Sequence, residues 1–161
     1  MTARGAEPPP RAVAWLGYGG LLPFVALASA AVAAHLSNHS PAMWHAALLA
    51  YSASILSFVG ALHWGFAMTL RGISPAQQTA SFVWSVVPAL VAWVALLTAP
   101  VVATALLVAG FAVHYGRDRR LTAQADLPAW YLPMRFRLTL VACLCLILSG
   151  TVARLHQLVA G

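Results

Sequence analysis

Two long uncharged stretches dominate the pattern of hydrophobic and polar positions along this chain. Residues 12–70 and residues 72–116 contain no Lys, Arg, Asp or Glu. A helix rises about 1.5 Å per residue and needs roughly 20 apolar residues to cross a hydrocarbon core of about 30 Å. Each stretch is therefore long enough for two membrane crossings and too long for one.

Breaks in this pattern divide the chain into five predicted spans. Polar or helix-breaking residues occupy positions 35–41, 71–75 and 98–100. The spans are predicted at residues 12–34, 42–70, 80–97, 101–115 and 136–153. The expected fold is an all-α, five-helix transmembrane bundle, with a membrane domain over 12–155, a disordered start over 1–11 and a short tail over 156–161.

The arginines predict how the bundle is oriented. With five spans, the N-terminus and the loops after the second and fourth spans share one side of the membrane. That side carries eight of the nine basic residues, all of them arginines: Arg4, Arg11, Arg71, Arg117, Arg119, Arg120, Arg135 and Arg137. The other side carries only Arg154. The positive-inside rule then predicts a cytoplasmic N-terminus and an external C-terminus.

The amino-acid composition argues against several classes of function. Hydrophobic residues make up 61% of the chain and charged residues 7%. The arginines lie at the ends of apolar segments, so the net charge of +6 favours anionic lipid headgroups as partners over nucleic acid. No predicted span contains Asp or Glu, so we expect no carboxylate metal site in the membrane and no enzymatic activity.

Small residues recur with a spacing of four along the second predicted span. They are Ala53, Ser57, Ala61 and Gly65. Such a stripe lets a neighbouring helix approach closely, so we interpret it as a helix-packing face and place the second span at the centre of the bundle.

The His63-Trp64-Gly65 segment is the most specific candidate for chemistry. An ionisable side chain inside a span suggests function, because a neutral imidazole can ligate haem iron, bind a quinone or relay a proton. Trp44 and Trp64 are about 30 Å apart along a helix, which matches the two interfacial belts and places His63 near the inner interface. An imidazole that only hydrogen-bonds a neighbouring helix or water is the more ordinary interpretation.

A site for a lipophilic cofactor, quinone or haem, is the alternative. Its walls would come from residues of similar predicted depth: Tyr18, His63, Trp64, Trp84 and His114. His114 and His63 differ in their distance from the next arginine, which predicts a depth difference of about 7 Å and argues against a bis-histidine haem. We therefore expect no cofactor and no metal. The remaining histidines, His35, His39, His45 and His156, are expected to be ordinary external interfacial residues, although imidazoles there could bind metal.

The segment between the fourth and fifth spans combines arginines with Trp130-Tyr131. It is predicted to lie at the headgroup boundary, with Asp118 paired to one of the arginines. Arg135 or Arg137 is expected to make a planar contact with a carboxylate or phosphate of a partner, which Lys cannot reproduce. The arginines at 117, 119 and 120 are expected to be interchangeable anchors.

Four segments together resemble a known family. They are LGYGGLLPF at 16–24, ILSFVGALHWG at 55–65, WSVVP at 84–88 and LPAWY at 127–131. They are similar to domain-of-unknown-function family 3429, which includes the transmembrane protein sixty-nine-like small membrane proteins, and the likeness extends from about residue 15 to about residue 154. The resemblance implies a small multi-pass protein of bacterial inner or mitochondrial inner membranes, with no activity, ligand or catalytic residue attached. Because few residues precede the first span, we expect the bacterial inner membrane.

Three functions remain open at this point. The first is a non-enzymatic interaction or assembly partner of a membrane complex, which the small-residue stripe and the arginine-rich loop favour. The second is the cofactor site. The third is a transporter, for which the spans offer only Ser54, Ser57, Pro23 and Pro88.

Overall fold

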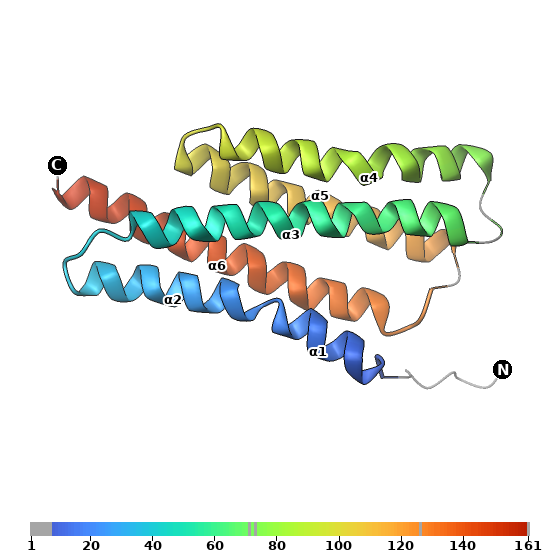
Figure 1. The fold of residues 1–161 in the computed structure, drawn as a ribbon, viewed down its shortest axis with the longest axis horizontal. Helices are drawn as coiled ribbons and strands as arrows, with labels where there is room; N and C mark the ends of the chain where they lie inside the picture. Colours follow the sequence, from blue (N-terminus) through green and yellow to red (C-terminus); the bar gives the residue numbers. More distant parts are fainter. Residues whose placement is uncertain (1–7, 71, 73, 126, 161) are drawn as a thin grey trace.

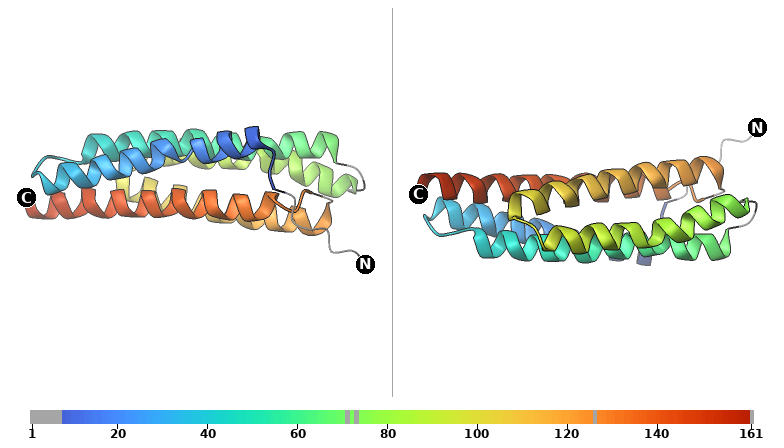
Figure 2. Two further views of the ribbon diagram at one scale, coloured as in Figure 1. Left: turned by 90° about the horizontal axis from the view of Figure 1, so that it is seen from below. Right: turned by 90° about the horizontal axis from the view of Figure 1, so that it is seen from above.

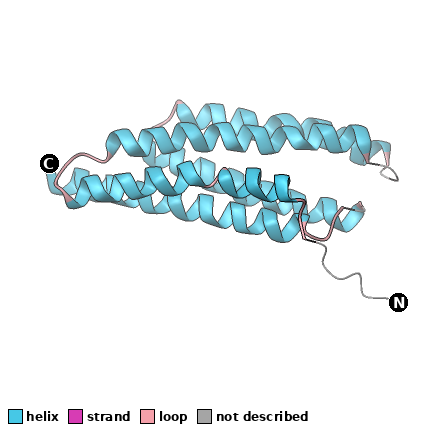
Figure 3. Cartoon of the chain, turned by 60° about the horizontal axis from the view of Figure 1, so that its bottom comes forward, coloured by secondary structure: helices cyan, strands magenta, loops and turns pink. Residues whose placement is uncertain are grey.

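The structure is a computed structural model that describes residues 8–70, 72, 74–125 and 127–160. All regular secondary structure in this part of the chain is helical (Figure 3). The helices are α1 (Arg11–Gly19), α2 (Leu22–Leu36), α3 (Ala42–Thr69), α4 (Pro75–Leu96), α5 (Pro100–Gln124) and α6 (Tyr131–Ala160). They run alongside one another in an elongated bundle (Figures 1 and 2).

Five of these elements are long and apolar enough to cross a membrane. They are α3, α4, α5, α6 and the combined segment from Arg11 to Leu36, which contains α1 and α2. The predicted all-α, five-helix bundle is therefore confirmed, and the chain is a membrane protein with several spans. The cytoplasmic position of the N-terminus stays a prediction.

The first span is broken between α1 and α2 (Figure 1). Pro23 lies in the first turn of α2 and has no backbone N–H, so it cannot continue the hydrogen-bond ladder of α1. Tyr51 of α3 donates its hydroxyl to the carbonyl oxygen of Gly20 at the break, 2.9 Å away. A side chain of the neighbouring helix thus satisfies a carbonyl beside the interruption.

Helix α3 is central, as predicted, and contacts α2, α4, α5 and α6. The predicted packing stripe is wrong for its second half, because Ala53 is buried and Ser57 half-buried whereas Ala61 and Gly65 are exposed. Each step of four residues turns about 40° around a helix, so the stripe moves from the core to the lipid-facing side. The close approach occurs at Gly60, where an added Cβ would lie 2.8 Å from Pro88 of α4.

Two helices extend further than their apolar segments. Helix α5 continues to Gln124 rather than ending near residue 115, and α6 begins at Tyr131 rather than near 136. Hydropathy marks where the hydrocarbon ends, whereas a helix continues wherever its backbone hydrogen bonds remain favourable. As a consequence, Asp118 lies within the α5 span, which corrects the expectation that no span carries a carboxylate.

Most of the described arginines lie at one end of the bundle. We call this end the arginine-rich end. Helices α1, α4 and α6 begin there, and α3 and α5 end there; it is the end nearer the N label in Figure 1. It carries Arg11, Arg117, Arg119, Arg120, Arg135 and Arg137, and the opposite end carries Arg154. Arg4 and Arg71 lie outside the described residues. The distribution agrees with the predicted sidedness of the spans.

Candidate functional site

Polar side chains from four helices meet inside the bundle at the arginine-rich end. We call this group the polar cluster: His63 of α3, Trp84 of α4, His114 and Asp118 of α5, and Tyr131 and Arg135 of α6. The side chains of His63 and Asp118 are 0% exposed and that of His114 is 1% exposed. A spacing of four residues along α5 puts His114 and Asp118 on the same buried face.

Asp118 is held by two residues of α6. Arg135 donates its Nε–H to Oδ2 at 2.7 Å, and Tyr131 donates its hydroxyl to Oδ1 at 3.1 Å. The guanidinium compensates the buried carboxylate, which would otherwise be very unfavourable in a low-dielectric interior. The expected pairing of Asp118 with an arginine is confirmed. The contact of Arg135 with a partner molecule, predicted from the sequence, is not seen; its guanidinium contacts Asp118 of the same chain.

The two histidines of the cluster lie in direct contact. Their ring centroids are 4.9 Å apart and the ring planes meet at 67°. The predicted depth difference of about 7 Å is therefore wrong, because it was counted from the next arginine along the chain, and α5 continues beyond Arg117. The Nε2 atoms of His63 and His114 lie 3.7 Å and 3.9 Å from Oδ1 of Asp118, beyond hydrogen-bond distance.

Trp84 determines which nitrogen of His114 carries the proton. The indole Nε1–H lies 3.1 Å from Nδ1 of His114, and an indole can only donate. Nδ1 is therefore the acceptor, and the neutral ring carries its proton on Nε2, facing Asp118. The guanidinium carbon of Arg117 lies over the Trp84 ring, 6.0 Å from its centroid, a cation–π contact.

Three imidazole nitrogens of the cluster have no hydrogen-bond partner among the described residues. They are Nδ1 and Nε2 of His63 and Nε2 of His114. The large majority of buried side-chain polar atoms in folded proteins are hydrogen-bonded, so this concentration within one contact pair is unusual. The cluster therefore has spare capacity to donate to, or accept from, a small ligand.

Other predicted site residues lie outside the cluster. Trp64 is 51% exposed and packs edge-on against Phe82, because it lies about 100° around the helix from His63. Tyr18 is exposed and its hydroxyl accepts a hydrogen bond from Arg137 at 3.3 Å. The structure thus brings together His63, Trp84 and His114 of the predicted cofactor wall and leaves Tyr18 and Trp64 at the surface.

Two members of the polar cluster were not predicted as site residues, Asp118 and Tyr131. The spacing of Asp118 four residues after His114 was a signal, because it places a carboxylate one helical turn from an imidazole. The aromatic residue at 131 carried no comparable signal, since Trp130-Tyr131 also matches an interfacial anchor.

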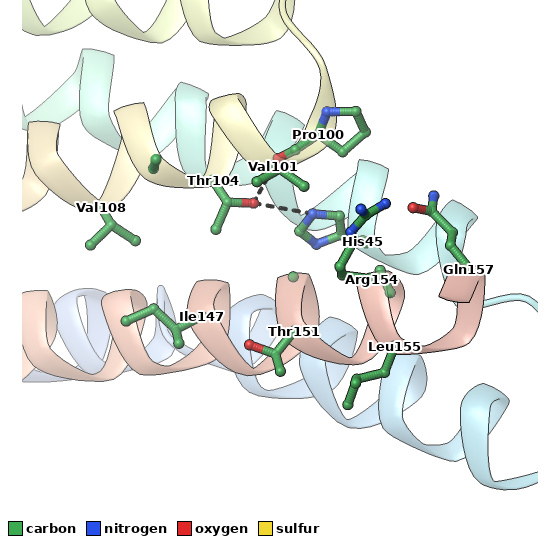
Figure 4. A pocket seen from close by; sticks show the side chains of 13 residues that line it. His45, Pro100, Val101, Thr104, Val108, Ile147, Thr151, Arg154, Leu155 and Gln157 are labelled. Atoms are coloured by element: carbon green, nitrogen blue, oxygen red, sulfur yellow. Dashed lines mark hydrogen bonds between the residues drawn. The ribbon is translucent and has the colours of Figure 1, made fainter. Parts of the chain in front are cut away.

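A third buried histidine lies near the opposite end, beside an open cavity of about 390 Å³ between α5 and α6 (Figure 4). His45 is 3% exposed and belongs to α3, so the expectation that it is an ordinary interfacial residue is wrong. Its Nδ1 lies 3.1 Å from the Ser149 hydroxyl and its Nε2 lies 3.2 Å from the Thr104 hydroxyl. Thr104 donates its own proton to the Pro100 carbonyl oxygen, so it accepts from Nε2–H and Ser149 donates to Nδ1.

The remaining histidines lie nearer the surface of that end. His35 and His156 approach each other with their Nδ1 atoms 3.4 Å apart, and His39 is exposed. This pair offers only two side chains to a metal. It serves below as a control site.

Comparisons with known proteins agree with the resemblance in the sequence. Residues 9–151 match the model of a family described as "Protein of unknown function (DUF3429)". The chain is 36% identical over 143 residues to Transmembrane protein 69 of Xenopus tropicalis, covering 86% of this chain and 53% of the relative. The chain thus spans about half the length of that curated relative. No solved structure matches it significantly.

Proposed function

Because this chain belongs to the DUF3429 family, whose description assigns no activity, we propose its function from its own residues. It is a non-enzymatic membrane protein that contacts another membrane protein complex through the arginine-rich end and supports the assembly of that complex. The proposed location is the bacterial inner membrane, with the arginine-rich end on the cytoplasmic side.

The buried ion pair between α5 and α6 carries this proposal. Asp118 and Arg135 join the two helices at the place where their exposed arginines emerge. Arg119 and Arg120 directly follow Asp118, and Arg137 lies two residues after Arg135. The ion pair supports a fixed arrangement of these side chains, which a partner carrying acidic groups can recognise.

The burial of the polar cluster supports a non-enzymatic role. His63, His114 and Asp118, the groups best suited to proton transfer or nucleophilic chemistry, have almost no exposed surface. A substrate would reach them only after the helices had separated. Exposed arginines bind partners but supply no general acid or base at neutral pH.

Charge reversal at the surface tests the proposal. The native protein, extracted in mild detergent, is used as bait beside an Arg119→Glu, Arg120→Glu double variant, with Arg154→Glu at the opposite end as the matched control. We expect the same membrane protein to be recovered with wild type and the control and lost with the double variant. Equal recovery with all three baits, or recovery of lipid alone, contradicts the proposal.

A lipophilic cofactor is the second proposal, favoured by the contact between His63 and His114. The rings touch each other, so a flat cofactor would have to enter beside them and not between them. The absorption spectrum and an organic extract of the purified protein test it. A haem spectrum or bound quinone that disappears in His63→Leu supports the cofactor, and a colourless, quinone-free preparation contradicts it.

A further inference from the structure

We propose that His63, His114 and Asp118 form a binding site for one transition-metal cation of the class that imidazoles prefer, with Zn²⁺ as the representative ion. One ligand atom from each side chain lies within 4.8 Å of the other two, and all three side chains are buried. The donor set of two imidazoles and one carboxylate is common in zinc sites that keep a fourth position open. The inference goes beyond the proposed partner contact and does not depend on it.

The distances suit a small cation. Zinc binds nitrogen and oxygen ligands at about 2.0–2.2 Å, which places the ligands of a tetrahedral site about 3.4 Å apart. The Nε2 atoms of His63 and His114 lie 3.7 Å and 3.9 Å from Oδ1 of Asp118. Closing these two gaps takes shifts of a few tenths of an ångström. The ligand nitrogens of His63 and His114 lie within 4.8 Å of each other, so metal binding also requires the two rings to approach by up to about 1.4 Å.

The unpartnered nitrogens are a second, independent observation. Nε2 of His63 and Nε2 of His114 have neither solvent contact nor a hydrogen-bond partner among the described residues, and both face the same carboxylate oxygen. A metal ion binds both nitrogens and that oxygen at once, provided that the Nε2 proton of His114 moves to Nδ1 and the hydrogen bond from Trp84 is given up. In zinc sites with three protein ligands a water molecule takes the fourth position, and the Tyr131 hydroxyl continues to donate to Asp118.

Arg135 orients the carboxylate ligand. Its Nε–H holds Oδ2 of Asp118 at 2.7 Å, which leaves Oδ1 directed toward the imidazoles. Outer groups of this kind fix the position of ligands in many metal sites. The positive charge of Arg135 also compensates Asp118, so the site attracts a cation less strongly than an unpaired carboxylate would. We therefore expect a dissociation constant in the micromolar range, not the far tighter binding of structural zinc sites.

Trp84 opposes metal binding at His114. Its indole N–H points at Nδ1, which keeps the ring proton on Nε2, the nitrogen that would bind the metal. Removing the indole donor lets the proton move to Nδ1 and leaves Nε2 free to act as a ligand. The proposal therefore predicts that Trp84→Phe binds zinc more tightly than wild type does, an effect that a purely structural cluster would not produce.

Metal titration of the purified full chain in detergent tests the site. After treatment with a chelator, wild type is expected to bind a single equivalent of Zn²⁺ in competition with a chromophoric chelator, and Co²⁺ to give the visible spectrum of a tetrahedral site. His63→Leu is expected to weaken binding by about 100-fold or more. Because His63 makes no hydrogen bond to the described residues, this variant is expected to keep the helical circular dichroism and elution volume of wild type.

Two controls locate the metal within the bundle. His45→Leu removes the buried histidine at the other end of α3, and His35→Gln with His156→Gln removes the surface pair. Both are expected to bind zinc as wild type does. Loss of binding in the His35, His156 variant with full binding in His63→Leu overturns the proposal, because it moves the metal to the opposite end. Failure of wild type to bind Zn²⁺ and Co²⁺ also overturns it and leaves the polar cluster as a structural network.

Discussion

The two buried histidines of α3, His45 and His63, lie toward opposite ends of the same helix in very different polar surroundings. His45 lies between the hydroxyls of Ser149 and Thr104, and each of its ring nitrogens has a partner. His63 lies beside a buried ion pair, and neither of its nitrogens has a hydrogen-bond partner in the part of the chain that the structure describes. Both rings are almost fully buried.

The difference shows that burial alone does not identify a functional histidine in a membrane helix. At His45 every proton has an acceptor, since Ser149 donates to the ring, the ring to Thr104, and Thr104 to the Pro100 carbonyl oxygen. That is the pattern of a structural residue that joins α3, α5 and α6. At His63 the available carboxylate already accepts from Arg135 and Tyr131, so the imidazole keeps its binding capacity.

The largest effect is expected when the ion pair of the polar cluster is broken. Asp118→Ala leaves the Arg135 guanidinium buried and uncompensated, so we expect a loss of about 3–5 kcal/mol in the free energy of unfolding. Thermal unfolding in detergent micelles, followed by circular dichroism, measures it. The double variant Asp118→Leu, Arg135→Leu removes both charges and is expected to recover most of the loss. A stable Asp118→Ala single variant would show that water reaches this end of the bundle.

His45→Leu is expected to have the next largest effect on the free energy of unfolding. It removes both hydrogen bonds of the ring and leaves the buried Ser149 hydroxyl without its partner, for a loss of about 1–3 kcal/mol. The same unfolding measurement applies, with His39→Leu at an exposed position as the control. Unchanged stability would mean that the hydroxyls find other partners and that His45 is not a structural link.

Trp84→Phe makes His114 more like His63, because it removes the hydrogen bond to Nδ1 of that ring. We expect a loss of about 0.5–1.5 kcal/mol in chelator-treated protein, the usual contribution of one hydrogen bond. Trp64→Phe, which alters an exposed indole on another helix, is the control. A larger loss would show that the indole packing against Arg117, and not the hydrogen bond, supports the cluster.

His63→Leu is expected to have the smallest effect on the free energy of unfolding of chelator-treated protein. Replacing a buried polar group that has no partner by an apolar one of similar size changes stability by less than about 1 kcal/mol, and the sign can be stabilising. Added Zn²⁺ is then expected to raise the unfolding temperature of wild type and not of the variant. A large loss in the absence of metal would mean that His63 has a structural partner, as His45 does.

The sequence determined the membrane class and the number of spans, because both follow from local sums of apolar residues. The uncharged runs over 12–70 and 72–116, with their polar and proline breaks, and the apolar segment at 136–153 predicted the five elements that are long and apolar enough to cross a membrane. They also predicted that the arginines share one end, since loop positions alternate between the two sides. His63 and His114 stood out as candidates because ionisable groups are unfavourable in a span wherever they occur.

Tertiary structure alone decided which of these residues meet in the polar cluster. In the sequence, Asp118 lies beside arginines at the end of an apolar run and has the features of an interfacial residue. In the structure, Arg135 and Tyr131 of α6 hydrogen-bond to it, and it is buried. The difference between His45 and His63 depends on hydroxyls at 104 and 149, remote in the sequence from either histidine. Hydropathy is a property of consecutive residues. Whether a buried nitrogen has a hydrogen-bond partner depends instead on atoms that distant helices bring within about 3 Å of it.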